Sequence, residues 1–287
     1  IIIPEVDPGL ILKLIEQEKI QHTIFVPAVI LFLIQHPDSA NTDFSSLETV
    51  IYGASPITDD TLLKAMELMD CNFWQVYGLT ETNGAITFLY PEDHDVSRGK
   101  LRSCGKAAKG VGLRVVDSED NDVPIGEVGE VIIKSELNMK GYWNRPEATA
   151  EAIKDGWFYS GDVGYFDDEG FLYIHDRVKD MIVSGGENIY PAEVENALLS
   201  HPNIADAAVI GIPDDKWGEA TKAFIVQVEG EKLSEDEVIS YARTQIAGYK
   251  CPKTVDHINE LPRNPSGKIL RKDLRAPFWE GKERNVS

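Results

Sequence analysis

Residues 75–82 combine a strand-like approach with a glycine, a hydroxyl and a carboxylate. The Thr80 hydroxyl and the backbone N–H groups near Gly78 suit phosphate oxygens. The Glu81 carboxylate suits a Mg²⁺ ion that phosphates also hold. A plain strand end and turn would look much the same, so this run predicts a phosphate site only if other parts of the chain support it.

Two charged residues further along the chain are of types that hold a ribose. Asp162 follows Gly161 in an expected turn, and its carboxylate can accept hydrogen bonds from both ribose hydroxyls, as acidic residues do in dinucleotide-binding folds. Arg177 lies in the polar run 176–180 and can pair with ribose or phosphate oxygens. Together they indicate a nucleotide site.

Two groups of small residues allow a ligand to approach the backbone closely. The run Gly53-Ala54-Ser55-Pro56 follows a strand pattern, and a flat ring can lie against such a turn. Gly185 and Gly186 precede a helix that begins at Pro191, and they also leave the backbone accessible. Each group alone is also typical of an ordinary turn.

Lys268 stands on an expected glycine-containing turn within residues 262–271. As a point charge on a loop it suits an α-phosphate, although most lysines are simply solvated. The stretch from Lys250 to Ser287 has nine Lys and Arg against five Asp and Glu, a net charge of +4 within a chain of −20. The remainder therefore carries −24. The C-terminal stretch would supply the locally basic part that a polyanionic ligand requires, although composition alone favours an ordinary solvated surface.

The elements around these residues change character along the chain. Residues 1–99 alternate helix and strand patterns, with Asp7 as a helix N-cap before Pro8, a helix over residues 30–34 and a strand over residues 47–52. This alternation predicts an α/β domain. Residues 100–177 contain short strands over 113–116, 130–134 and 171–175 between turn clusters, which predicts a small β-barrel-like subdomain or antiparallel sheet.

Residues 178–287 predict a small α+β domain. A helix begins at Pro191, strands follow over 207–212 and 223–228, and Ser234 with Glu237 forms a capping box at the start of another helix. The acidic run 117–127 fails as a calcium loop because Asp122 stands where that loop needs glycine.

Composition excludes several functional classes. The net charge of −20 argues against a nucleic-acid partner, and no apolar run reaches the roughly 18 residues of a membrane span. Three widely spaced cysteines argue against a disulfide framework, and the six histidines lack zinc-type spacing. We therefore predict a cytoplasmic protein without a membrane span, for which a homodimer is compatible with the sequence.

In order and spacing, these motifs resemble the acyl- and aryl-CoA synthetase branch of the adenylate-forming enzymes, from about residue 20 to 275. The resemblance implies ATP, Mg²⁺ and coenzyme A as ligands and a carboxylic acid, fatty or aryl, as substrate. It implies that Lys268 is the catalytic lysine, that Thr80 touches the α-phosphate, and that Glu81 holds Mg²⁺. The other implied roles are the adenine pocket for Gly53, Ala54, Ser55, Pro56, Tyr77 and Gly78, the ribose for Asp162 and Arg177, a hinge at Lys179, and the pantetheine tunnel for Gly185 and Gly186.

One feature of the family is missing from the sequence. Its Thr/Ser/Gly-rich phosphate loop lies upstream of these motifs, and we find no such segment here. We therefore expect the chain to be the C-terminal half of an enzyme of roughly twice this length, and inactive by itself. On this resemblance, residues 1–99 are the remainder of its large AMP-binding domain.

The expected reaction has two halves, formation of an acyl-AMP and transfer of the acyl group to CoA. An adenylation enzyme that loads a carrier protein is the nearest alternative, although no carrier domain follows Lys268. A luciferase-like oxygenase is a remoter one. A non-catalytic nucleotide-binding fragment is the alternative from another class; the missing phosphate loop favours it, and the presence of Lys268 argues against it.

Overall fold

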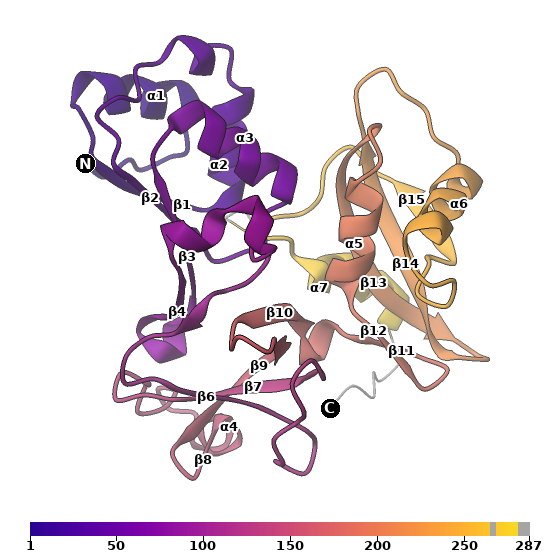
Figure 1. Ribbon diagram of the computed structural model, residues 1–287. Coiled ribbons are helices and arrows are strands. Elements are labelled where there is room, and N and C mark those ends of the chain that lie inside the picture. The colour runs from indigo at the N-terminus through magenta and orange to yellow at the C-terminus, as the bar shows by residue number, and fades with distance from the viewer. Residues whose placement is uncertain (265–267, 281–287) are drawn as a thin grey trace. The chain divides into compact units, whose positions relative to one another are not determined.

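The computed structural model describes residues 1–264 and 268–280 (Figure 1). They form two compact units, which we call unit 1 (residues 1–160 and 164–174) and unit 2 (residues 161–163 and those from His175 onward). Each unit has hydrophobic clusters of its own. The domain limits predicted after residues 99 and 177 remain a prediction.

The first sheet of unit 1 has the order β1-β2-β3-β4-β5. Its strands are β1 (His22–Phe25), β2 (Thr49–Gly53), β3 (Asn72–Leu79), β4 (Gly84–Leu89) and β5 (Lys106–Ala107). The first three run parallel, and β3, β4 and β5 pair antiparallel. The helices of this part are α1 (Pro8–Gln17), α2 (Pro27–Gln35) and α3 (Asp59–Met69). The predicted α/β organisation is confirmed.

Local signals explain where these helices begin. The Asp7 carboxylate accepts a hydrogen bond from Leu10 N at 2.9 Å and caps α1, as predicted. The predicted helix over residues 30–34 is longer at both ends, because Pro27 is well suited to a first helical position. Apolar side chains from all three helices, such as Leu12, Ile30 and Leu62, are almost fully buried in one cluster with strand residues.

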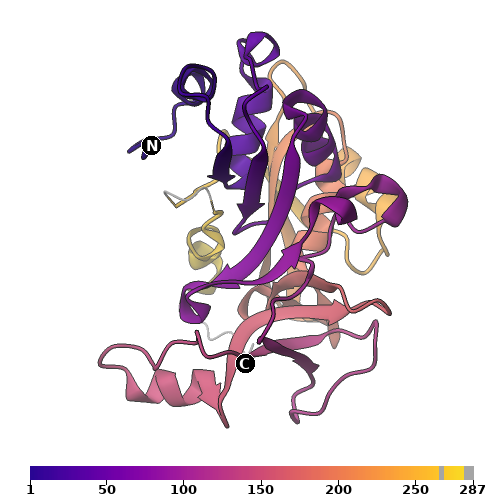
Figure 2. The same ribbon diagram turned by 60° about the vertical axis from the view of Figure 1, so that its left-hand side comes forward.

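The second sheet belongs to unit 1 except for residues 161–163 and 175–177, and it follows the path β10-β9-β7-β6, with β8 beside β9. It comprises β6 (Gly112–Val116), β7 (Gly129–Lys134), β8 (Ile153–Lys154), β9 (Trp157–Phe166) and β10 (Leu172–Arg177), with helix α4 (Pro146–Ala152) before β8 (Figure 2). We predicted a barrel-like subdomain or an antiparallel sheet. The described strands form an open sheet, and no closed barrel is found among them.

Unit 2 is built on a sheet of order β12-β11-β14-β13, with β15 beside β14. Its elements are the 3-10 turn η5 (Val178–Asp180), β11 (Ile182–Ser184), β12 (Glu187–Ile189), α5 (Pro191–Leu199), β13 (Ile204–Asp214), β14 (Gly218–Gln227), α6 (Glu235–Gln245), β15 (Thr254–His257) and α7 (Arg271–Trp279). Ser234 and Glu237 form the predicted capping box of α6.

Strand β13 serves two separate clusters of this unit. Ala207 and Val209 lie in the cluster with α5 and α6, whereas Ala208 and Ile210 lie in the cluster that receives α7 side chains. Because alternate residues of a strand point to opposite faces, α5 and α6 cover one face of the sheet and α7 the other (Figure 1). The predicted α+β organisation is confirmed.

A buried tyrosine–histidine pair holds the end of β2. The Tyr52 hydroxyl lies 3.0 Å from His94 Nε2, and His94 Nδ1 lies 2.8 Å from the Tyr90 carbonyl oxygen. Since a carbonyl only accepts hydrogen bonds, Nδ1 carries the proton, and Nε2 accepts from Tyr52. Burial lowers the pKa of His94, against the opposing effects of Tyr90 and Asp93.

This pair predicts a pH-dependent stability for unit 1. A histidine with a lowered pKa contributes stability that is fully present above its unfolded pKa of about 6.5 and is lost as pH falls through its folded pKa. We expect the free energy of unfolding to decrease below about pH 6.5 by up to about 1.4 kcal/mol per pH unit. Urea unfolding between pH 8 and 5 measures this slope. His94→Gln should reduce it and His22→Gln, at an exposed position, should not; equal slopes in both variants would contradict the assignment.

Candidate active site

The turn after β2 lies at the carboxyl end of the parallel strands. Gly53 ends β2 and pairs in register with Val76 of β3, and a Cβ at Gly53 would overlap the Val76 carbonyl oxygen. Ala54 follows with φ +70°, a backbone conformation that is unusual for a residue with a side chain. The run Gly53-Ala54-Ser55-Pro56 therefore lies at the same end of the sheet as Tyr77 and Gly78, where open α/β sheets bind their ligands.

Residues Thr80 and Glu81 lie in the connection between β3 and β4. The short 3-10 helix η2 (Thr80–Thr82) is fixed by Thr82, whose buried hydroxyl lies 2.9 Å from both Leu79 N and the Gly84 carbonyl oxygen. Thr80 is exposed and Glu81 is half-buried. The turn thus leaves the hydroxyl of Thr80 accessible while Thr82 has the structural role.

The carboxylate of Glu81 is held by a residue to which the sequence assigned no role. Tyr142 donates its hydroxyl hydrogen to Glu81 Oε1 at 2.9 Å, and Met139 N donates to the Glu81 carbonyl oxygen at 2.7 Å. Among the described residues, none bonds Glu81 Oε2. A contact between residues 61 positions apart leaves no signal in the spacing of the sequence.

A single carboxylate with one open oxygen fits Mg²⁺ that is held mainly by phosphates. No group of three or more His, Cys, Asp or Glu side chains that could hold a metal ion by itself is found in residues 1–264 and 268–280. Mg²⁺ usually keeps several waters and takes one or two protein carboxylates beside substrate phosphates. Glu81 with Oε2 available is compatible with that arrangement.

Asp162 and Arg177 come together in unit 2. Arg177 Nε lies 3.1 Å from Asp162 Oδ1, and Asp162 is only 5% exposed. The turn predicted around Asp162 was wrong, because residues 159–162 lie inside β9. Gly161 interrupts that strand with φ +67°, which explains why the sequence resembled a turn.

Lys268 belongs to the same electrostatic environment. The residue is exposed as a whole, but desolvation around its ammonium and the positive charge of Arg177 lower its pKa, while Asp162 and Asp180 act in the opposite direction. Its backbone N donates to Asn264 Oδ1 at 2.9 Å. The predicted turn at Gly267 lies outside the described residues.

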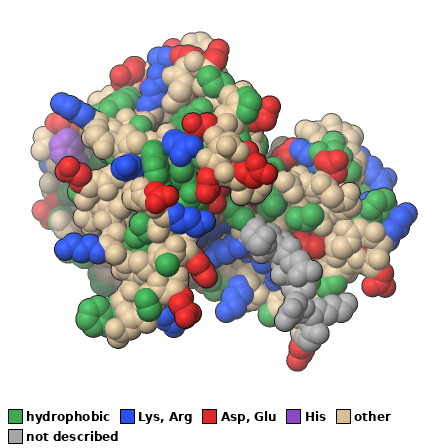
Figure 3. Space-filling view, turned by 90° about the horizontal axis from the view of Figure 1, so that it is seen from below, with side chains coloured by type: hydrophobic (Ala, Val, Ile, Leu, Met, Phe, Trp, Pro, Cys, Tyr) green, Lys and Arg blue, Asp and Glu red, His purple; other side chains and the backbone are tan. Residues whose placement is uncertain are grey.

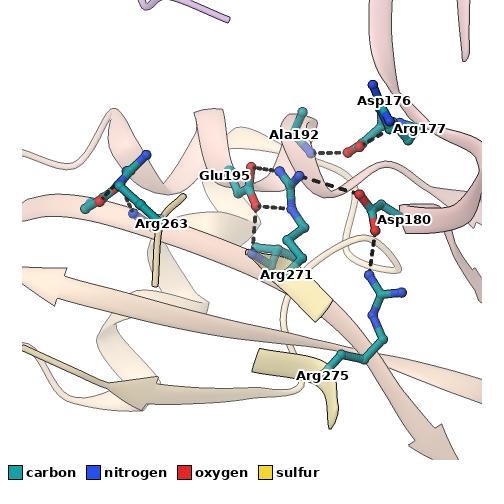
Figure 4. Close-up of polar contacts among 11 residues, drawn as sticks. Asp176, Arg177, Asp180, Ala192, Glu195, Arg263, Arg271 and Arg275 are labelled. Atoms are coloured by element: carbon teal, nitrogen blue, oxygen red, sulfur yellow. Dashed lines mark hydrogen bonds and ion pairs between the residues drawn. The ribbon is translucent and has the colours of Figure 1, made fainter. Parts of the chain in front are cut away.

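Asp176 supports both Arg177 and the start of α5 (Figure 4). Its Oδ1 accepts from Arg177 N at 2.8 Å, and its Oδ2 accepts from Ala192 N at 2.9 Å. Ala192 is the second residue of α5, so a carboxylate from outside the helix satisfies one of its unpaired N–H groups. Burial raises the pKa of Asp176, against the opposing charge of Arg271.

The two glycines of the β11–β12 hairpin differ in their surroundings. Gly185 and Gly186 have φ +63° and +86°, as a two-residue turn with positive φ at both positions requires. A Cβ at Gly185 would lie 2.7 Å from the Trp217 ring, whereas a Cβ at Gly186 would meet nothing within 4 Å. Packing therefore requires Gly185, while the backbone at Gly186 is open to a ligand. Lys179, the predicted hinge, is exposed in η5.

The structure thus gathers the candidates into two sets. In unit 1 the set at one end of the first sheet comprises Gly53, Ala54, Ser55, Pro56, Tyr77, Gly78, Thr80 and Glu81. In unit 2 the set comprises Asp162, Arg177 and Lys268. Lys179 lies two residues from Arg177, and Gly185 and Gly186 lie on their hairpin.

On the face in Figure 3 acidic and basic side chains are interspersed. None of the described helices is both long and apolar enough to cross a bilayer.

Comparisons with known proteins agree in pointing to one family. Residues 1–143 match the profile of the family described as AMP-binding enzyme, and residues 193–268 match that of the AMP-binding enzyme C-terminal domain. The chain is 41% identical over 262 residues to the fatty acid–[acyl-carrier-protein] ligase ScoC of Streptomyces coeruleorubidus, a match that covers 91% of this chain and 50% of that protein. It is 40% identical over 293 residues to the medium/long-chain-fatty-acid–CoA ligase FadD8 of Mycobacterium tuberculosis, with coverages of 100% and 51%.

A solved structure with the same fold has a bound intermediate. The o-succinylbenzoate CoA synthetase MenE of Bacillus subtilis, in complex with the acyl-adenylate OSB-AMP, superposes with a TM-score of 0.83 at 34% identity, over 98% of this chain and 55% of that one. The chain spans about half the length of the curated relatives it matches.

Proposed function

The chain belongs to the AMP-binding enzyme family, and on that premise we propose that the protein is an acid–thiol ligase that forms an acyl-AMP from a carboxylic acid and ATP and transfers the acyl group to CoA. The observation that carries the proposal is the buried Asp162 paired with Arg177 in the electrostatic environment of Lys268. A carboxylate for ribose hydroxyls, a guanidinium and a separate ammonium suit a nucleotide whose α-phosphate reacts.

The adenine is proposed to lie against the turn Gly53-Ala54-Ser55-Pro56, beside Tyr77 and Gly78. Support comes from the placement of these residues at the carboxyl end of parallel strands. Thr80 would contact the α-phosphate, and Asp162 and Arg177 would hold the ribose. Asp162 already pairs with Arg177. Because a carboxylate has about four acceptor positions, Asp162 would also accept hydrogen bonds from the ribose hydroxyls.

In the first half-reaction the substrate carboxylate attacks the α-phosphorus in line. The bond to the bridging oxygen breaks, and pyrophosphate leaves with that electron pair. Lys268 would donate hydrogen bonds to the α-phosphate oxygens as charge develops on them. Mg²⁺ held by Glu81 would neutralise phosphate charge. No covalent enzyme intermediate forms, so positioning and electrostatics account for the catalysis.

In the second half-reaction the thiolate of CoA attacks the acyl carbonyl carbon, and AMP leaves. We propose that the C-terminal part turns about Lys179 between the two steps, so that Lys268 withdraws and the hairpin of Gly185 and Gly186 approaches. The open backbone at Gly186 supports this role, because a narrow pantetheine chain needs a wall without side chains.

The acid is proposed to be fatty or aryl. Residues 83–89, most of which form β4, are small and apolar on average and follow the phosphate turn. Two relatives are by name fatty-acid ligases, which supports the same class. One of them acts on an acyl carrier protein, so a carrier-protein thiol is the second candidate acceptor.

The test is AMP release by the full-length protein with a panel of carboxylic acids, with and without CoA. Release that requires both a fatty or aryl acid and CoA would support the ligase. Acid-dependent pyrophosphate exchange without any effect of CoA would assign the protein to carrier-protein loading. No dependence on any acid would refute the enzymatic proposal and leave a nucleotide-binding protein.

Tyr142→Phe is expected to weaken the use of Mg²⁺ in the first half-reaction. The variant loses the hydrogen bond that orients Glu81, and outer partners of metal-binding groups typically contribute about 10–100-fold to affinity or activity. The Mg²⁺ concentration for half-maximal pyrophosphate exchange should rise about tenfold. Tyr249→Phe, at an exposed tyrosine in unit 2, is the matched control. An unchanged Mg²⁺ dependence would show that Tyr142 does not position the carboxylate.

A further inference from the structure

An arginine of helix α7 binds the turn that contains Lys179. Arg275 Nη2 donates to Asp180 Oδ1 at 2.6 Å (Figure 4). Arg275 Nη1 donates to the Lys179 carbonyl oxygen at 3.3 Å. Both acceptors lie in η5 or at its end, 95 and 96 positions upstream. The side chains of Arg275 and Asp180 are only 16% and 14% exposed, so this contact is screened little by solvent.

A second arginine, one helical turn earlier, connects the same carboxylate to the body of unit 2. Arg271 Nη1 lies 3.8 Å from Asp180 Oδ2, while its Nε and Nη2 donate to the two oxygens of Glu195 at 3.1 and 2.6 Å. Glu195 on α5 also accepts from Val209 N of β13 at 2.8 Å. Arg271 of α7 therefore links Asp180 to Glu195 of α5, and through Glu195 to strand β13.

The carbonyl that Arg275 binds lies where it affects a rotation at Lys179. The Lys179 carbonyl lies downstream of both backbone torsions of that residue, so a change in its φ or ψ carries the carbonyl along with everything that follows. Arg275 holds this carbonyl and the next side chain against α7. The peptide between Lys179 and Asp180 is thus fixed to α7 and moves with it.

We propose that Arg275 is a positioning residue that fixes this peptide to α7 and thereby confines the rotation between the two half-reactions to φ and ψ of Lys179. The inference rests on the proposed function, since only a two-step reaction requires the rotation. Without the guanidinium, η5 is free to unwind and the rotation spreads over several residues. The Gly186 hairpin then reaches its thiol-transfer position less often.

The test is hydrogen exchange at Met181 in the full-length protein. The Met181 amide closes η5 by donating to the carbonyl oxygens of Arg177 and Val178 at 3.1 and 3.3 Å, so its exchange rate reports opening of the turn. In Arg275→Gln we expect it to exchange about tenfold faster, as the loss of a hydrogen bond to a charged group implies. Arg243→Gln, at an exposed arginine of α6 in the same unit, should leave the rate unchanged.

The rates of the two half-reactions are the second test. In Arg275→Gln, thioester formation from supplied acyl-AMP should slow about tenfold, and acyl-AMP formation should change by less than about twofold. Arg275→Lys keeps the charge but cannot make the forked pair of contacts. Its rate of thioester formation should therefore lie between those of Arg275→Gln and the parent protein.

The outcomes separate this inference from the function on which it rests. Unchanged Met181 exchange in Arg275→Gln overturns the inference, and so does an equal acceleration across η5, α7 and β13, which would mean that Arg275 only stabilises the unit. Faster exchange confined to η5 with selective loss of thiol transfer supports it. A parent protein without acid-dependent adenylation would instead refute the proposed function.

Discussion

Replacing Lys268 by alanine is expected to slow acyl-AMP formation by about 10²–10³-fold, the usual effect of removing one donor that stabilises developing charge. Formation of the thioester from supplied acyl-AMP should change by less than about twofold, because Lys268 is proposed to have withdrawn by then. The lowered pKa of Lys268, caused by desolvation and by Arg177, fits an ammonium that meets a phosphate in a partly dry site.

The two half-reactions can be followed separately, as acid-dependent pyrophosphate exchange and as CoA-dependent consumption of a synthetic acyl-AMP. Lys272→Ala, at an exposed lysine four residues away, should affect neither rate. Equal losses of both half-reactions in Lys268→Ala would refute the assignment of this lysine to the first step alone.

Glu195→Ala is expected to lower the free energy of unfolding of unit 2 by about 3–5 kcal/mol. The Glu195 residue is 7% exposed and accepts both hydrogen bonds of the Arg271 fork as well as one from Val209 N. Among the described residues, the ion-pair contact that remains for the buried guanidinium is Asp180 at 3.8 Å, and a buried backbone N–H loses its partner.

Urea unfolding followed by circular dichroism measures this loss. Glu193→Ala is the matched control, because Glu193 is on the same helix and also pairs with a basic residue, Lys250, but at a position 29% exposed. It should cost no more than about 1 kcal/mol. The double replacement Glu195→Leu with Arg271→Met should recover much of the stability, since apolar pairs often replace buried ion pairs without loss. Similar losses in Glu195→Ala and Glu193→Ala would contradict this account.

Sequence reasoning succeeded where a structure depends on near neighbours. The Asp7 cap of α1 and the capping box of Ser234 and Glu237 each involve residues three positions apart, so their chemistry is legible in the sequence. Helix α5 begins at Pro191 for a similar reason, because a fixed φ and a missing N–H suit the first helical position. The family followed from the order of motifs.

Sequence reasoning failed where a residue contacts a partner that is far away in the sequence. Tyr142 with Glu81, and Arg275 with Lys179, are pairs 61 and 96 positions apart, and no periodicity connects them. The turn expected at Asp162 was wrong because tertiary pairing extends β9 through Gly161, a residue whose presence usually signals a break. The roles of the individual site residues remain predictions.

The contacts of α7 also bear on the order of events when unit 2 folds. Strands β13 and β14 are consecutive and are joined by residues 215–217, so their hairpin closes a short loop at little entropic cost. Helix α7 instead meets Gly211 through Trp279, and Asp180 through Arg275, at separations of 68 and 95 positions. Contacts this distant cost more chain entropy before they stabilise anything, so they form late. The segment that carries Lys268 is therefore expected to acquire its final position last, after the sheet already exists.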